Sequence, residues 1–294
     1  MRALPRLSFS FALLSIALPA QKAEATFDWM KRTAKIAYEA LPIGDHSLEQ
    51  LKIGAPWRLG GSHDASTWQP TMPILVGEQW IAPGAYRIAL LRQDETKCVI
   101  VADGSHSALG GREAVQVPGA LGKTAKPAKK LAIELGKKGA AALGNQPAQL
   151  VVQFGADEWR GDVTVLGNKT VPVGGGKLAV FSVPSASVEK GAVPIASLAL
   201  GKDVADSWNV IFDGGKVRLV PWMQAPKTIE DAPVAPDSAK VLEGTVTPLD
   251  VKLDKELEVL ELREAAMAKG ELRLVVAFGA KVVECKMPEP KKGK

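Results

Sequence analysis

The sequence of 294 residues is poor in cysteine, histidine and tyrosine, with two, three and two of them respectively. So few thiols and imidazoles leave little material for a structural metal cluster, and the sequence predicts no metal site and no cofactor. An excess of one charge is also missing, since 37 basic and 32 acidic residues leave a net charge of only +5. This near balance excludes a polybasic protein that binds nucleic acid.

Several catalytic motifs are missing as well. The chain has no His-Glu-x-x-His metal motif and no Gly-x-Ser-x-Gly nucleophile turn. The run Gly174-Gly175-Gly176-Lys177 lacks the upstream glycine of a phosphate-binding loop, so it predicts a hairpin turn instead. With 46% hydrophobic and 23% charged residues, the chain can nevertheless bury a substantial core, which excludes wholesale disorder.

The N-terminus has the three zones of an export signal. Arg2 and Arg6 precede an uncharged apolar stretch that is shorter than the about 20 residues needed to span a bilayer. Ala23-Glu24-Ala25 then supplies the small residues that a signal peptidase requires, which predicts cleavage after Ala25 and a net charge of +3 for the remaining 269 residues. The alternative is an N-terminal membrane anchor. We expect an exported protein, periplasmic or secreted, without an integral membrane segment after the signal is removed.

Apolar periodicity predicts an all-β fold after one short helix. Residues 26–40 resemble an amphipathic helix, because Phe27, Met30 and Ala34 recur every three or four residues. Beyond them, short apolar runs alternate with a period of two and are interrupted by many of the 28 glycines and 20 prolines. We therefore expect a β-sandwich with a short N-terminal helix after the signal peptide.

Three segments share a pattern that predicts repeated strand–hairpin units. In each, a leucine-rich run precedes an apolar run that ends at phenylalanine and a tight turn, and a further strand follows. The phenylalanines are Phe154, Phe212 and Phe278, and the turn residues are Gly155, Asp213-Gly214 and Gly279. The pattern favours strands over helices for the leucine runs at 131–135 and 257–262. Separately, residues 166–169 lie between two β-branched runs and predict a hairpin.

These features divide the chain into seven parts. They are a signal peptide (1–25), an N-terminal helix and lead-in (26–46), a β-sandwich (47–168), a second β unit packed on it (169–223), a proline-rich linker (224–240), a third β unit (241–287) and a basic tail (288–294).

Residues 50–103 resemble domain-of-unknown-function family 2911, and the likeness extends more loosely to about residue 165. The segment from Trp57 and Arg58 to Thr67 is similar to the family's Trp-Arg-x-Gly-Ala-Asn-x-x-Thr sequence. The run from Gly77 to Gly84-Ala85-Tyr86 is similar to its hairpin. The family consists mostly of exported bacterial β-sandwich proteins without an established activity. The resemblance therefore implies the fold and the export, but no catalytic residue.

The densest polar cluster of the sequence surrounds His63. Ser62, His63 and Asp64 are candidates for a hydrolytic site, and Trp57 and Arg58 are candidates for ligand binding. In the functional interpretation, Arg58 binds an anion through two hydrogen bonds and Trp57 stacks on a ligand. In the structural interpretation, Trp57 is buried and Arg58 pairs with a carboxylate, and we favour this one. The spacing of His46, His63 and His106 matches no metal motif.

The cysteines and tryptophans leave further alternatives open. Cys98 and Cys285 both alternate with apolar residues, so they face inward either as a disulfide or as two buried free thiols. The seven tryptophans are expected in the core or at sheet edges, and the alternative is a sugar-stacking platform with at least two exposed rings.

The sequence best supports a binding function: an exported, non-enzymatic β-sandwich that binds an envelope component, a glycan or a protein partner. A hydrolase that uses the loop around His63 and a carbohydrate-binding module are the two alternatives.

Overall fold

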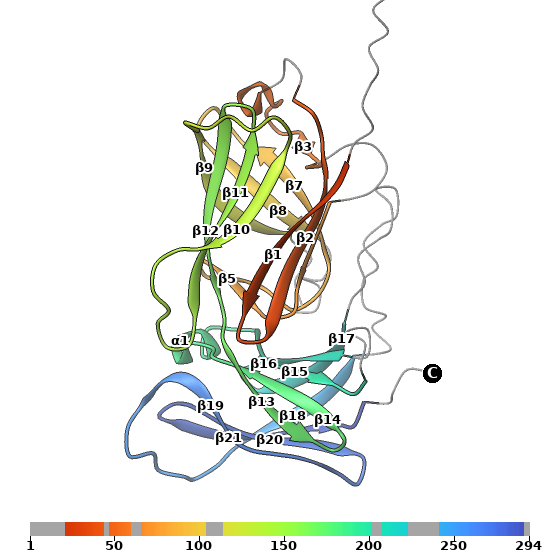
Figure 1. Cartoon of the computed structure of the whole chain (residues 1–294). Coiled ribbons are helices and arrows are strands. Elements are labelled where there is room, and N and C mark those ends of the chain that lie inside the picture. Colours follow the sequence, from red (N-terminus) through yellow and green to blue (C-terminus); the bar gives the residue numbers. More distant parts are fainter. Residues whose placement is uncertain are drawn as a thin grey trace, which may run out of the picture.

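A computed structural model describes residues 21–43, 47–59, 66–103, 114–201, 207–222 and 241–290, and it consists almost entirely of β-strands (Figure 1). The first sheet contains β1 (Gln21–Trp29), β2 (Arg32–Ala40), β3 (Pro56–Trp57), β4 (Thr67–Pro70), β5 (Ile74–Val76), β6 (Gln79–Ile81), β7 (Tyr86–Arg92), β8 (Cys98–Asp103), β9 (Val115–Lys123), β10 (Ala132–Lys137), β11 (Gln146–Phe154) and β12 (Asp157–Val165).

The second sheet contains β13 (Asn168–Val173), β14 (Gly176–Phe181), β15 (Val193–Ala199), β16 (Ser207–Asp213), β17 (Lys216–Pro221), β18 (Leu242–Pro248), β19 (Leu257–Ala268), β20 (Glu271–Gly279) and β21 (Lys281–Pro288). Two helical turns accompany the strands in the described residues, η1 (Leu48–Gln50) and α1 (Ser185–Val188). Among the described residues, no helix has the length and apolar content that crossing a membrane requires.

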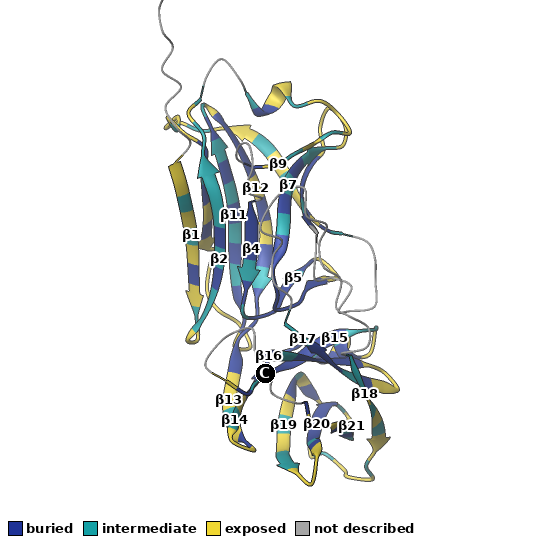
Figure 2. Cartoon of the chain, turned by 90° about the vertical axis from the view of Figure 1, so that its right-hand side faces the viewer, coloured by how far each residue is buried: buried dark blue, intermediate teal, exposed yellow. Residues whose placement is uncertain are grey.

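Each sheet curls until its two ends approach each other. Nine strands of the first sheet follow the order β1-β2-β4-β7-β8-β9-β12-β11-β10, and β1 contacts β10. The second sheet has the order β13-β14-β15-β16-β17-β18-β21-β20-β19, and β13 contacts β19. All strand pairs are antiparallel. The all-β prediction is therefore confirmed, but the strands form two nearly closed, barrel-like sheets that lie end to end (Figures 1 and 2).

One apolar core includes buried residues of both sheets. Buried residues alternate with more exposed ones along many of the strands (Figure 2). In the first sheet the centre of this core is the indole of Trp159, which is fully buried and donates a hydrogen bond from Nε1 to the Cys98 carbonyl at 2.9 Å. The ring lies over two strand glycines, Gly119 and Gly161, which are partners across β9 and β12. A side chain at either position would overlap the indole.

The predicted N-terminal helix is wrong. Residues 21–40 form the β1–β2 hairpin instead, and its turn is Met30-Lys31, with φ of 48° and 63°. Phe27 of β1, and Ala34 and Ile36 of β2, are the buried residues of this hairpin, with the period of two that a strand requires. The helical pattern misled because Phe27, Met30 and Ala34 also happen to be spaced three and four apart.

The three phenylalanine hairpins are confirmed. They are β11–β12, β16–β17 and β20–β21, and the preceding leucine runs lie on β10, β15 and β19, each paired with the first strand of its hairpin. Phe154, Phe212 and Phe278 are 7%, 2% and 3% exposed, and the glycines that follow have positive φ. Units two and three share one sheet, because β18 pairs with both β17 and β21.

The hairpin predicted at residues 166–169 is wrong, because this segment connects the two sheets. Its glycine is required for close approach rather than for a turn, since a Cβ on Gly167 would lie 2.0 Å from the Gly144 carbonyl oxygen. The buried Asn145 holds the crossing: its Oδ1 accepts from Gly167 N at 3.0 Å and its Nδ2 donates to Ser182 O at 2.9 Å. Gly174-Gly175, by contrast, forms the predicted hairpin turn between β13 and β14.

Several predicted segments fall outside the described residues. These are residues 1–20 of the predicted signal peptide, the predicted linker at 224–240 and residues 291–294 of the tail. The last five residues of the predicted signal peptide, 21–25, are described, and they belong to β1.

Candidate functional site

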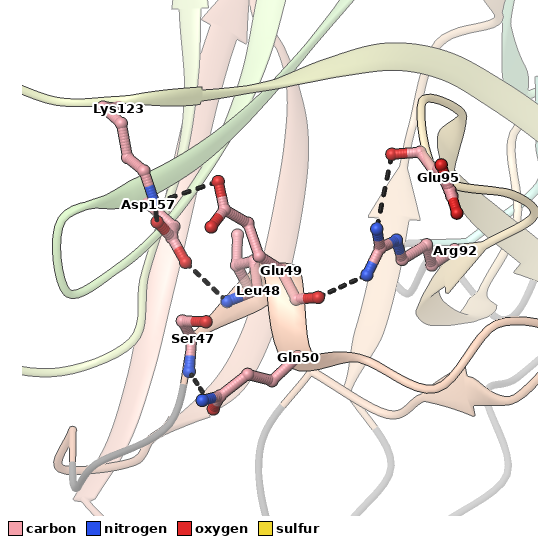
Figure 3. A network of polar contacts seen from close by, with 8 residues as sticks. All are labelled: Ser47, Leu48, Glu49, Gln50, Arg92, Glu95, Lys123 and Asp157. Carbon is pink, nitrogen blue, oxygen red and sulfur yellow. Dashed lines mark hydrogen bonds and ion pairs between the residues drawn. The ribbon is translucent and has the colours of Figure 1, made fainter.

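A polar network fastens η1 to the end of the first sheet that faces away from the second (Figure 3). Its centre is Asp157 at the start of β12, whose side chain is only 3% exposed. Asp157 Oδ2 accepts a hydrogen bond from Leu48 N at 2.7 Å, and its Oδ1 binds Lys123 Nζ. Lys123 also pairs with Glu49 at 3.0 Å. The network therefore joins η1 to β9 and β12.

Electrostatics identify the role of Asp157. Burial raises the pKa of its carboxyl, but hydrogen bonds from Lys123 and from the backbone of Leu48 and Glu49 outweigh this, so the pKa lies below the ordinary value of 3.8. Asp157 is thus held as a carboxylate with its acceptors occupied. Its hydrogen bond to Leu48 N fastens η1 to β12.

On the other side of η1, Arg92 at the end of β7 gathers three carbonyl groups. It donates to Glu49 O from Nη1 and to Glu95 O at 3.3 Å from Nη2 (Figure 3). It also donates to Asp94 O at 3.2 Å from Nε. These contacts hold the loop between β7 and β8 against η1. The whole network is therefore best explained as a clamp on the loops at this end.

The described start of the sequence-predicted loop lies beside this network, because Trp57 pairs with β7, the strand that ends at Arg92. Trp57 forms the short β3 with Pro56, pairs with Leu90 of β7, and packs on Phe154 with ring centroids 5.3 Å apart. The structural interpretation expects a buried Trp57, and the structure has this side chain half-buried. Arg58 is exposed. Ser62, His63 and Asp64, and likewise His46 and His106, lie outside the described residues, so the hydrolase hypothesis stays untested.

The tryptophans do not provide the platform that a carbohydrate-binding module requires. All seven are described, and none is exposed. Trp68, Trp80 and Trp159 are buried, and Trp29, Trp57, Trp208 and Trp222 are half-buried. The core interpretation of the tryptophans is therefore the one that the structure favours.

Both cysteines are buried free thiols, and they lie in different sheets, Cys98 on β8 and Cys285 on β21. Their predicted inward orientation is confirmed, but the disulfide alternative is not formed. Burial raises the pKa of the Cys98 thiol to about 11 and that of Cys285 to about 12. Neither thiol is suited to act as a nucleophile.

A groove of about 650 Å³ lies on the second sheet, under the connection from β18 to β19. Its floor is the outward face of three strands, with Leu257 from β19, Val275 from β20 and Val282 from β21. The connection adds Leu249 and Leu253, which pack on this floor and form a small apolar cluster separate from the main core. Val251 lines the groove as well and is 51% exposed.

Charged side chains surround this apolar floor. Glu261 and Arg263 of β19 form an ion pair at 3.1 Å, and Lys252, Asp254 and Lys255 come from the connection. Within the part of the chain that the structure describes, Lys252 and Lys255 form no ion pair. The rim therefore carries three basic and two acidic groups, a small excess of positive charge.

A smaller groove of about 430 Å³ lies on the first sheet. Its two charged side chains, Lys138 and Asp162, are bonded to each other, and Gln149 donates to Asp162 at 2.9 Å. The Lys138 bond lowers the pKa of Asp162. Since the polar groups of this groove already satisfy one another, the groove of the second sheet is the stronger candidate for a ligand site.

The groove of the second sheet was not predicted from the sequence. The signal was the alternation of Leu249, Val251 and Leu253 with charged residues, which is typical of a half-buried strand. In the structure these residues form no strand, although the alternation still marks their apolar face. The role of Asp157 was not predicted either, because aspartate is common next to hairpin turns and its presence there indicates no special function.

Comparisons with protein-family models, with curated proteins and with solved structures find no match for this chain.

Proposed function

We propose that the chain is an exported, non-enzymatic binding protein of a bacterial envelope, and that the groove of the second sheet holds its ligand. The observation that carries this proposal is the groove itself, an apolar floor of about 650 Å³ with a charged rim. That volume falls within the about 300–1,000 Å³ typical of small-molecule sites. The floor side chains are aliphatic, so they cannot transfer a proton and cannot act as nucleophiles toward a ligand. The groove therefore favours binding over catalysis.

The ligand class follows from the two parts of the groove. The aliphatic lining, in which the exposed Val251 accompanies the buried floor, favours a flexible apolar chain, because burial of each methylene contributes about 0.8 kcal/mol. At the rim, Lys252 and Lys255 favour an acidic group at the end of that chain. We therefore propose an amphipathic anion, such as an acyl chain that carries a carboxylate.

Two sequence features support the remaining parts of the proposal. The three-zone N-terminus supports export, and the resemblance of residues 50–103 to family 2911 supports a bacterial envelope protein. The two segments that resemble this family, one beginning at Trp57 and one ending at Tyr86, meet on neighbouring strands. Trp57 of β3 pairs with Leu90 of β7, and β7 begins at Tyr86.

Binding of dodecanoate, measured by titration calorimetry below its micellar concentration, tests the ligand class. Wild-type protein should bind one dodecanoate saturably. Val251→Asp places a negative charge inside the groove and should weaken binding at least tenfold. Ile53→Asp is the matched control, because Ile53 is similarly exposed, at 49%, but lies in the turn between η1 and β3. Absence of saturable binding, or equal losses in both variants, would show that the groove is not the site.

A charge reversal separates the rim from the floor. Lys252→Glu combined with Lys255→Glu should weaken dodecanoate binding while dodecanol, which has the same chain without the charge, binds as to wild type. Equal effects on both compounds would contradict the assignment of the two lysines to an acidic group.

A further inference from the structure

Strand β1 begins at Gln21, five residues before the end of the sequence-predicted signal peptide. Residues 21–25 pair in register with residues 36–40 of β2, from Gln21 opposite Ala40 to Ala25 opposite Ile36. Cleavage after Ala25 would therefore remove more than half of a nine-residue strand and leave this part of β2 without its partner.

Side chains of the same five residues contribute to the fold. Ala25 packs on the main core, opposite the fully buried Ile36. Glu24 forms an ion pair with Lys35 of β2, and Gln21 Oε1 accepts a hydrogen bond from Lys130 Nζ at 3.1 Å. Since Lys130 directly precedes the β10 region, this last bond links the two ends of the curled sheet.

The position of β1 adds a topological reason. It is the first strand of the sheet order and contacts β10, the last one, so the first sheet approaches closure through β1 (Figure 1). An unpaired edge on β2 would expose backbone donors and acceptors that template aggregation. The folded protein therefore uses residues that cleavage after Ala25 would discard.

We propose that the signal peptide is removed after Ala20, so that the mature chain begins at Gln21 and keeps the whole of β1. The proposal rests on the export that the proposed function includes. Ala20 supplies the small side chain directly before the scissile bond and follows the apolar stretch directly, while Leu18 stands where the site after Ala25 has Ala23. The case for Ala20 therefore rests on the strand that cleavage after Ala25 would cut, not on the cleavage pattern alone. In the cleavage, water adds its oxygen to the Ala20 carbonyl carbon, the bond to Gln21 nitrogen breaks, and that nitrogen leaves as the protonated amine.

The test is the N-terminus of the protein after export. The full chain, with its own signal, is expressed in a bacterium and recovered from the periplasm, and its intact mass and N-terminal sequence are determined. The expected product starts at Gln21, either as the free amine or as the cyclic form that an N-terminal glutamine yields by loss of ammonia. A product that starts at Thr26 overturns the proposal while leaving export intact. A cytoplasmic product that keeps Met1 overturns both the proposal and the export.

Two variants identify the scissile bond independently. Ala20→Tyr places a large side chain before the proposed bond and should abolish production of the chain that starts at Gln21. Ala25→Val, which suits a strand but not a signal peptidase site, should leave processing unchanged and alter the product only by the mass of its larger side chain. The reverse pattern, normal processing of Ala20→Tyr and failure of Ala25→Val, would place the bond after Ala25.

Discussion

The packing of Trp159 on two glycines predicts that a single methyl group will disrupt the first sheet. A Cβ on Gly119 would lie 2.3 Å from Trp159 Cε2 and 2.4 Å from the Arg160 carbonyl oxygen. A Cβ on Gly161 would lie 2.4 Å from Trp159 Cη2 and 2.8 Å from the Pro118 carbonyl oxygen. Cβ atoms in proteins essentially never lie closer than 3.0 Å to another heavy atom. Both contacts with the indole are more than half an ångström below that limit, and the two carbonyl oxygens belong to backbone that cannot rotate away.

The indole cannot yield easily, because it is fully buried and its Nε1 is bonded to the Cys98 carbonyl. Overpacking of a tight core costs about 1–3 kcal/mol. We expect Gly119→Ala and Gly161→Ala to lower the free energy of unfolding by about 3 kcal/mol each, at the upper end of that range. The matched control is Gly122→Ala, on the same strand β9, where a Cβ meets nothing within 4 Å. It should be neutral or stabilise by up to about 0.5 kcal/mol.

Urea unfolding followed by far-ultraviolet circular dichroism measures these effects, because the signal reports on strands rather than on individual tryptophans. A double-mutant cycle with Trp159→Leu tests the cause: without the indole, Gly119→Ala should cost at least about 1 kcal/mol less. If Gly119→Ala unfolds at the same urea concentration as Gly122→Ala, the indole does not lie over β9 and the reasoning fails.

Three further predictions follow from the core and the network. Phe212→Ala and Phe278→Ala should each destabilise by about 3–5 kcal/mol, and less than additively together, because their rings meet at 5.5 Å; thermal melts that equal wild type would contradict this. The lowered pKa of Asp157 means that its stabilisation is complete above its ordinary value of 3.8 and is lost as the pH falls below that value, so urea midpoints between about pH 6 and about pH 3 should fall less steeply in Asp157→Asn. Cys98 and Cys285 should react with iodoacetamide only after unfolding, and a mass change on reduction of the native protein would refute the free thiols.

The sequence predicts a strand correctly where the spacing of its apolar residues, or the pattern around it, fits a strand and not a helix. The run at 257–262 is rich in helix-forming residues, yet its place before an apolar run that ends at Phe278 and a glycine identified it as strand β19. The prediction for the N-terminal hairpin was wrong because its turn, Met30-Lys31, adopts positive φ without glycine or asparagine. Without a turn signal, the segment could be interpreted as one continuous element.

Glycines mislead for a related physical reason. Gly155 and Gly279 serve turns with positive φ, and the sequence predicts them correctly. Gly119, Gly161 and Gly167 instead allow a ring or a carbonyl to approach the backbone. Each of the three glycines has such a contact with a residue more than 20 positions away: Gly119 with Trp159, Gly161 with Pro118 and Gly167 with Gly144. No local pattern therefore separates a turn glycine from a packing glycine.

The difference between a sandwich and two curled sheets also lies beyond local patterns, because both have the same alternation of inward and outward residues along every strand. What distinguishes them is which strands meet at the ends, here β1 with β10 and β13 with β19. This distinction matters for the candidate site. The described strands of the second sheet direct side chains such as Leu274, Val276 and Phe278 into the main core. The outward residues Val275 and Ala277 of β20 are apolar too. They are buried beneath Leu249 and Leu253 of the connection from β18, while Val251 of that connection is exposed. Strand β20 is therefore apolar on both faces. Its inner face belongs to the main core, and its outer face supports the proposal that the ligand binds on the outside of the sheet.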